Sequence, residues 1–117
     1  MDETAFKQRT KELALGVIGL IESLSRTKVV AVIGRQLVRS ATSVGANYRA
    51  ACCGKSTADV LAKLAIVEEE GDKTAYWLEL LVTAGIVPES KMAPLLKESN
   101  EIIVITVASI KTLRTRK

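Results

Sequence analysis

This chain has no histidine and few aromatic residues. Among its 117 residues there are no histidines, two prolines and 3% aromatics, whereas 48% are hydrophobic. Without histidine the chain lacks the commonest general base and metal ligand near neutral pH. The scarcity of aromatics predicts an aliphatic, alanine-rich core that suits close helix packing better than a ligand cavity, so no small-molecule substrate is expected.

The remaining reactive side chains do not form a catalytic or metal-binding pattern. Cys52 and Cys53 are adjacent, so they cannot join distant segments and are too few to hold zinc. The acidic run 68–70 with Asp72 lacks the histidines that di-iron bundles combine with glutamate. The serine, threonine and cysteine side chains have no plausible base, and the chain has no glycine-rich phosphate loop. We therefore predict a protein that is not an enzyme and that binds no cofactor or metal.

Long hydrophobic runs are also missing. The uncharged windows 29–34 and 102–110 are much shorter than the roughly 20 residues that cross a bilayer. The first residues are acidic and do not resemble a secretory signal. These features predict a cytoplasmic protein without a membrane partner, and the length predicts a single domain over residues 1–117.

Apolar residues recur at helical spacing in four segments. The predicted helices cover about residues 4–25, 29–53, 56–85 and 91 onward, with Gly54 ending the second and a capping box beginning at Ser56. Residues 102–107 are all β-branched, which by composition favours a strand. The heptad spacing continues through them without a break, however, and favours a helix. Short loops make sequential helices antiparallel, so the predicted fold is an all-α, up-down-up-down four-helix bundle. The predicted core positions are Phe6, Leu13, Val17, Leu20 and Leu24, then Val30, Ile33, Leu37, Val44 and Tyr48, then Val60, Leu64, Val67, Gly71, Thr74, Leu78 and Leu81, then Met92, Leu96, Ser99, Ile103, Thr106, Ile110 and Leu113.

The second predicted helix has more than one distinctive face. Beside its apolar stripe lie a stripe of small residues, a polar stripe and a basic stripe, which predicts contacts beyond its own bundle. Glycine inside a helix is unfavourable without a packing reason, so the small stripe predicts a close helix contact. The small stripe is Gly34, Val38, Ala41, Gly45 and Cys52, the polar stripe is Gln36, Ser40, Ser43 and Asn47, and the basic stripe is Arg35, Arg39 and Arg49.

Charge is unevenly distributed along the chain. Residues 1–67 carry 10 Lys and Arg against 5 Asp and Glu, residues 68–110 carry 3 against 8, and residues 111–117 carry 4 against none. Guanidinium groups suit phosphates, so RNA or DNA is a candidate partner. Two alternatives remain: the arginines pair with the acidic run 68–70 of the same or a neighbouring subunit, or the basic tail only complements a helix dipole. The candidate nucleic-acid-binding residues are Arg35, Arg39, Arg49, Lys55, Arg114, Arg116 and Lys117.

Two segments have more apolar surface than one bundle can cover. Ile66, Trp77 and Leu80 form a second stripe on the third helix, and residues 102–105 are apolar around the whole helical turn. These features predict self-association, because Trp and Tyr are favoured interface anchors. Alternatively, the two aromatics lie at the edge of the bundle. The candidate interface residues are Ile66, Tyr76, Trp77, Leu80, Ile102 and Ile105.

Segments 36–49 and 63–81 carry a family resemblance. They resemble the bacterial four-helix-bundle proteins that are encoded in intervening sequences of large-subunit ribosomal RNA genes. The first segment reads Gln-Leu-Val-Arg-Ser-Ala-Thr-Ser-Val-Gly-Ala-Asn-Tyr-Arg, and the second reads Lys-Leu-Ala-Ile-Val-Glu-Glu-Glu-Gly-Asp-Lys-Thr-Ala-Tyr-Trp-Leu-Glu-Leu-Leu. The chain departs from the pattern at Ala50 and Lys73, where glutamate is common.

The resemblance implies a homopentameric ring of such bundles. A related branch, the accessory proteins of diversity-generating retroelements, is a basic pentamer that works with a reverse transcriptase and nucleic acid. We therefore expect a non-enzymatic homo-oligomer that binds nucleic acid or a ribonucleoprotein. The alternative is a protein–protein scaffold or assembly factor without nucleic-acid binding.

Overall fold

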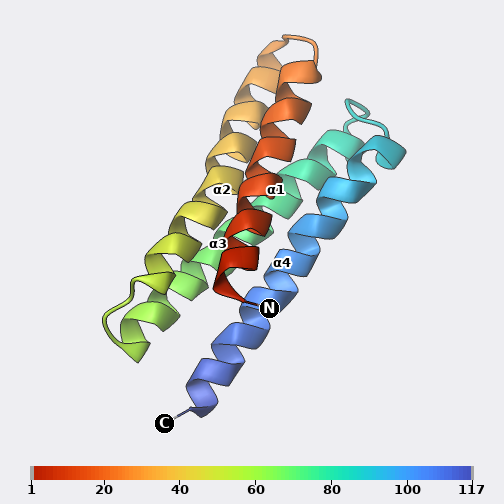
Figure 1. The fold of residues 1–117 in the computed structure, drawn as a ribbon. Coiled ribbons are helices and arrows are strands. Elements are labelled where there is room, and N and C mark those ends of the chain that lie inside the picture. Colours follow the sequence, from red (N-terminus) through yellow and green to blue (C-terminus); the bar gives the residue numbers. More distant parts are fainter. Residues whose placement is uncertain (1, 117) are drawn as a thin grey trace.

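A computed structural model describes residues 2–116, and in this range the chain forms four helices and no strand. The helices are α1 (Glu3–Ser23), α2 (Lys28–Cys52), α3 (Thr57–Thr83) and α4 (Glu89–Thr115). Figure 1 shows the chain turning back at each of the three short loops, so that the four helices lie along one another. The bundle is elongated, with principal extents of 49 × 21 × 21 Å.

Side-chain caps begin the first three helices. The carboxylate of Asp2 and the hydroxyls of Thr27 and Ser56 each accept a hydrogen bond from the amide three residues later, at 2.7, 3.1 and 3.1 Å. Each cap satisfies an amide that has no partner within the helix. Asp59 accepts from the amide of Lys55 at 3.2 Å and not from that of Ser56, so the predicted capping box is only half formed.

The end of α3 is built on a glycine with positive φ. Gly85 has φ 76°, the amide of Ile86 donates to Leu81 O at 3.0 Å, and the amide of Gly85 donates to Val82 O at 2.9 Å. This is the Schellman arrangement, in which glycine adopts the left-handed conformation without steric cost. Gly54 does not have this conformation: α2 ends at Cys52 and Cys53 is its C-cap.

The buried positions largely follow the predicted periodicity. Every position predicted on α3 is buried except Val60, which is partly buried. Residues 102–107 are helical, as the heptad spacing predicted. On α4, however, Ile102 is buried in place of Ile103. Leu24, Tyr48, Leu96 and Leu113 are only partly buried.

The small-residue stripe of α2 packs against α1. A Cβ atom added to Gly34 would lie 3.2 Å from Ile21 Cγ2, and one added to Gly45 would lie 3.1 Å from Thr10 Oγ1. Ala41, between the two glycines, is fully buried. The predicted close helix contact is therefore confirmed, and it lies within the bundle.

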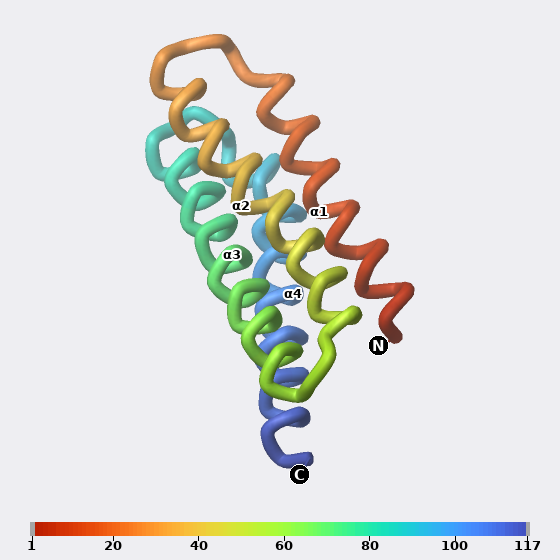
Figure 2. Tube along the Cα trace, turned by 90° about the vertical axis from the view of Figure 1, so that its left-hand side faces the viewer, coloured from red at the N-terminus to blue at the C-terminus, as the bar shows by residue number. Residues whose placement is uncertain are grey.

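The contact of α1 with α4 is sparse, and it combines apolar packing of Phe6 and Leu13 on Ile102 with one charged cluster. The Arg9 guanidinium donates to both carboxylate oxygens of Glu98, at 2.9 Å for one of them, and to Glu101. Hydrogen bonding to Glu98 raises the pKa of Arg9, so this side chain stays charged. Figure 2 shows that the two helices overlap along only part of their length, because α1 begins part-way along the bundle whereas α4 continues to the end of the bundle.

We expect Gly45→Leu to destabilise the fold by about 1–3 kcal/mol, because extra methylenes would have to displace α1 from a closely packed position. Urea denaturation followed by circular dichroism measures the change. Gly19→Leu is the matched control, since no atom lies within 4 Å of a Cβ added there. Equal stability of the two variants would show that the small-residue stripe has no packing role.

We expect Arg9→Ala to destabilise the protein by about 1–3 kcal/mol, because it leaves partly buried carboxylates without their charged donor. The amides of α1 should also exchange with solvent faster, which hydrogen-exchange mass spectrometry measures. Lys7→Ala is the control: its pair with Glu3 is exposed and within one helix, so the change should be small. If both variants had the same α1 exchange, the Arg9 cluster would not hold α1 to α4.

Candidate nucleic-acid and assembly surfaces

One end of the bundle carries a group of exposed basic residues. There, Ala51, Leu64 and Ile110 form an apolar cluster that joins α2, α3 and α4. Figure 1 shows the α2–α3 loop and the C-terminus at this same end. Lys117, also predicted to bind nucleic acid, lies outside the described residues. The exposed basic side chains near this end are Arg49, Lys55, Lys111, Arg114 and Arg116.

Arg35 and Arg39 lie elsewhere on the molecule. A helix rises 1.5 Å per residue, so Arg35 is about 21 Å from Arg49 along α2. The predicted basic stripe is therefore divided into two separate regions. With Arg26, Arg35 and Arg39 border a groove of about 790 Å³ between α1 and α2. The apolar side chains that line this groove include Ile21, Leu24, Val30 and Val38.

These arginines are not paired with the acidic run of α3 in the same chain. Within residues 2–116, no carboxylate lies within 4.0 Å of Arg35, Arg39 or Arg49. Instead, Lys73 pairs with two carboxylates of this run, with its Nζ 3.5 Å from Glu69 Oε1 and 3.1 Å from Glu70 Oε2. The hydrogen bond to Glu70 raises the pKa of Lys73. Pairing of the arginines with a neighbouring subunit remains a prediction.

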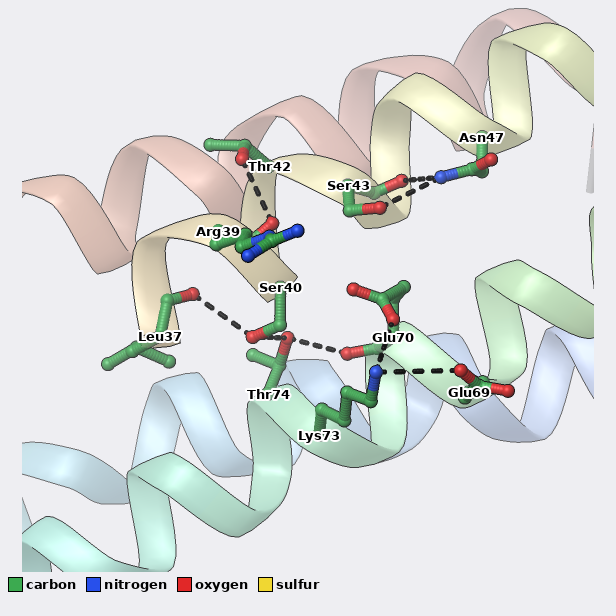
Figure 3. A network of polar contacts seen from close by, with 10 residues as sticks. All are labelled: Leu37, Arg39, Ser40, Thr42, Ser43, Asn47, Glu69, Glu70, Lys73 and Thr74. Carbon is green, nitrogen blue, oxygen red and sulfur yellow. Dashed lines mark hydrogen bonds and ion pairs between the residues drawn. The ribbon is translucent and has the colours of Figure 1, made fainter. Parts of the chain in front are cut away.

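A polar layer interrupts the apolar contact between α2 and α3. Thr74 Oγ1 donates to Ser40 Oγ at 3.0 Å or to Glu70 O at 2.8 Å, and Ser40 Oγ donates to Leu37 O at 3.1 Å. Both hydroxyls are buried, and buried polar groups are tolerated when they are hydrogen-bonded. Figure 3 shows this layer, with Glu70 and Lys73 on α3 facing Arg39 and Ser43 on α2.

A polar pocket of about 440 Å³ opens above this layer. Its lining residues all come from the two segments that carry the family resemblance. Sequence reasoning identified the polar stripe of α2 but did not predict a pocket, because the pocket depends on which α3 residues lie opposite. The lining residues are Gln36, Arg39, Ser40 and Ser43 on α2, with Ile66, Glu70, Lys73 and Trp77 on α3.

The candidate interface residues on α3 are exposed to different degrees. Tyr76 is 56% exposed and Ile66 is 38% exposed, so both present apolar surface to the outside. Trp77 and Leu80 are partly buried because they pack on the core of their own bundle. Tyr76 contacts Trp77 edge to face, with ring centroids 5.1 Å apart.

On α4 the structure corrects one of the candidate interface residues. Ile102 is 1% exposed and packs in the core with Phe6, Val44 and Val67, so it has no surface left for a second subunit and its assignment was wrong. The exposed apolar residue of this turn is its neighbour Val104, at 67%. Ile105 is partly buried and borders a shallow groove with Val104, Lys97, Asn100 and Glu101.

Burial disfavours the charged form of two reactive side chains, Cys52 and Tyr48. Burial raises the pKa of the Cys52 thiol, which disfavours the nucleophilic thiolate. Burial also raises the pKa of Tyr48. In residues 2–116 no group of three or more Cys, Asp or Glu side chains is placed to hold a metal ion. No helix of this range is both long enough and apolar enough to cross a membrane.

Comparisons with known proteins agree with this architecture. A solved structure from Bacteroides thetaiotaomicron, described as a protein of unknown function from the S23 ribosomal protein family, is 32% identical and superposes with a TM-score of 0.87. The alignment covers 95% of this chain and 99% of that one. A search of curated proteins found no match. Residues 2–108 match the family model described as 23S rRNA-intervening sequence protein. This chain belongs to the 23S rRNA-intervening sequence protein family.

Proposed function

We propose that this protein is a non-enzymatic homo-oligomer that binds nucleic acid or a ribonucleoprotein through its basic surfaces. The observation that carries the proposal is that Arg35, Arg39 and Arg49 are exposed and that no carboxylate of the described residues pairs with them. Exposed arginines bind phosphates through paired hydrogen bonds and release counterions from the nucleic acid. Membership of a family named for ribosomal RNA supports this class of partner.

The proposed assembly is a homopentameric ring whose subunit is an antiparallel, up-down-up-down four-helix bundle. Exposed apolar side chains on two different helices support self-association, because monomeric proteins rarely expose large apolar patches. Ile66 and Tyr76 provide this surface on α3, and Val104 provides it on α4. A ring would repeat each basic region once per subunit, so weak phosphate contacts would add up.

The second candidate is a protein–protein scaffold without nucleic-acid binding. It is favoured by the apolar groove between α1 and α2, which Arg26, Arg35 and Arg39 border. Asp72 and Glu79, about one turn on either side of Tyr76 in α3, are exposed, so a neighbouring subunit could satisfy the arginines. In that case the α2 arginines would be buried in interfaces and would contact no phosphate.

We expect the purified protein to be oligomeric at micromolar concentration, and multi-angle light scattering gives the subunit number. Trp77→Ala should weaken assembly by about 2 kcal/mol or more if this residue is an interface anchor. Glu89→Ala is the control, since Glu89 is exposed in the first turn of α4 and is not a candidate interface residue. A stable monomer would contradict the proposed assembly, and unchanged assembly of Trp77→Ala would place that residue at the bundle edge.

We expect the protein to bind generic RNA and DNA with little sequence preference and with affinity that falls steeply as salt increases. Fluorescence anisotropy at low and physiological salt measures both. Replacing Arg114, Arg116 and Lys117 by glutamine should lower the affinity and flatten the salt dependence while the oligomer persists. The control replaces Lys91 and Lys97 in the first half of α4, which removes two charges instead of three and touches no candidate binding residue. Absence of binding at low salt would favour the scaffold.

A further inference from the structure

The polar pocket between α2 and α3 contains hydrogen-bond donors that the protein does not use. Arg39 is exposed, and within residues 2–116 no carboxylate is paired with it. Asn47 Nδ2 donates to Ser43 Oγ at 2.8 Å, which leaves the hydroxyl proton of Ser43 free, and no described residue accepts it. Arg39 and Ser43 are one helical turn apart on α2, so they face the same side.

The floor and the charged wall of this pocket are already in place. Ser40 and Thr74 are hydrogen-bonded to each other and to the backbone, so the floor needs no rearrangement to receive a ligand. The Glu70 side chain is 14% exposed, and Lys73 compensates its charge. With Arg39 included, the pocket has a net positive charge and attracts an anion.

Apolar and aromatic side chains of α3 line the pocket on either side of these charged residues. Trp77 and Ile66 line the pocket from α3, so its ligand should combine an anionic group with an apolar or aromatic body. The pocket volume of about 440 Å³ lies within the range of small-molecule sites. A nucleotide has the required features: its phosphate accepts a guanidinium fork, and its base packs on an aromatic ring.

We propose that this pocket binds one phosphate-bearing nucleotide, with Arg39 and Ser43 contacting the phosphate and Trp77 contacting the base. The proposal deepens the nucleic-acid function proposed above and rests on it for the class of ligand. It assigns base contact to the α2–α3 pocket and general phosphate attraction to the basic end of the bundle. Trp77 is the only tryptophan of the chain, so its fluorescence reports on the pocket directly.

The test is a titration of the intact oligomer with uridine monophosphate, with Trp77 fluorescence as the readout. Uridine, inorganic phosphate and acetate are titrated in parallel. We expect saturable quenching by the nucleotide, with at least tenfold weaker binding of uridine, phosphate and acetate. Equal affinity for phosphate or acetate would overturn the proposal, because the pocket would then bind any small anion, including a carboxylate from a neighbouring subunit.

Matched variants separate a specific contact from general charge. Arg39→Gln should weaken nucleotide binding about tenfold or more, the range for a hydrogen bond to a charged group. Arg35→Gln removes the same charge one turn away, outside the pocket lining. This variant should change the nucleotide affinity less than about twofold. Ser43→Ala should weaken nucleotide binding severalfold. Thr42→Ala should leave it unchanged, because the Thr42 hydroxyl donates to the backbone of its own helix. Equal effects within either pair would contradict the assigned contacts.

The two experiments together test the nucleotide pocket separately from the proposed binding of RNA or DNA. RNA binding by anisotropy without any Trp77 response to the nucleotide would overturn the pocket and leave the proposed function standing. Saturable nucleotide binding without RNA or DNA binding would support the pocket and contradict the proposed function. Light scattering on each variant checks that the oligomer is unchanged, since Trp77 is also a candidate interface residue.

Discussion

The close contact of α1 with α2 determines which faces of α2 remain available for other partners. Gly34 and Gly45 admit Ile21 and Thr10 of α1 at distances that a larger side chain would not allow. Successive residues of a helix are rotated by 100°, so orienting this face toward α1 orients every other face of the helix. The apolar stripe then turns to the core, the polar stripe turns to α3, and the arginines are left outside.

The polar layer between α2 and α3 is the second constraint, and it serves packing and surface chemistry together. Ser40 and Thr74 are buried, and their hydrogen bonds offset most of the cost of removing hydroxyls from water. Because hydroxyls need a partner at one specific position, the layer favours one alignment of the two helices. The same alignment brings Arg39 opposite Lys73 and Glu70, which creates a pocket that neither helix has alone.

The charged residues of the molecule have different roles according to their partners. Arg9 is enclosed by Glu98 and Glu101 and joins two helices, so its charge is used within the fold. Lys73 is paired with the acids of its own helix. The exposed arginines of α2 and the basic end of the bundle have no such use within the described residues, and they remain for partners outside the subunit. Ile66 and Trp77 line the pocket at Arg39 and are also candidate interface residues, so assembly and phosphate binding share part of the α3 surface.

The sequence by itself determined the number of helices, most of their core residues, the close contact at Gly34 and Gly45, and the family, because periodicity, caps and motifs are local properties. It did not distinguish Ile102 from Ile103, since both lie in a turn that is apolar on every side and only the position of the neighbouring helices decides which is buried. It also did not predict the partners of Arg9, the separation of Arg35 from Arg49, or the pocket at Arg39. Those features depend on which residues of distant helices lie opposite one another, and only tertiary packing sets that alignment.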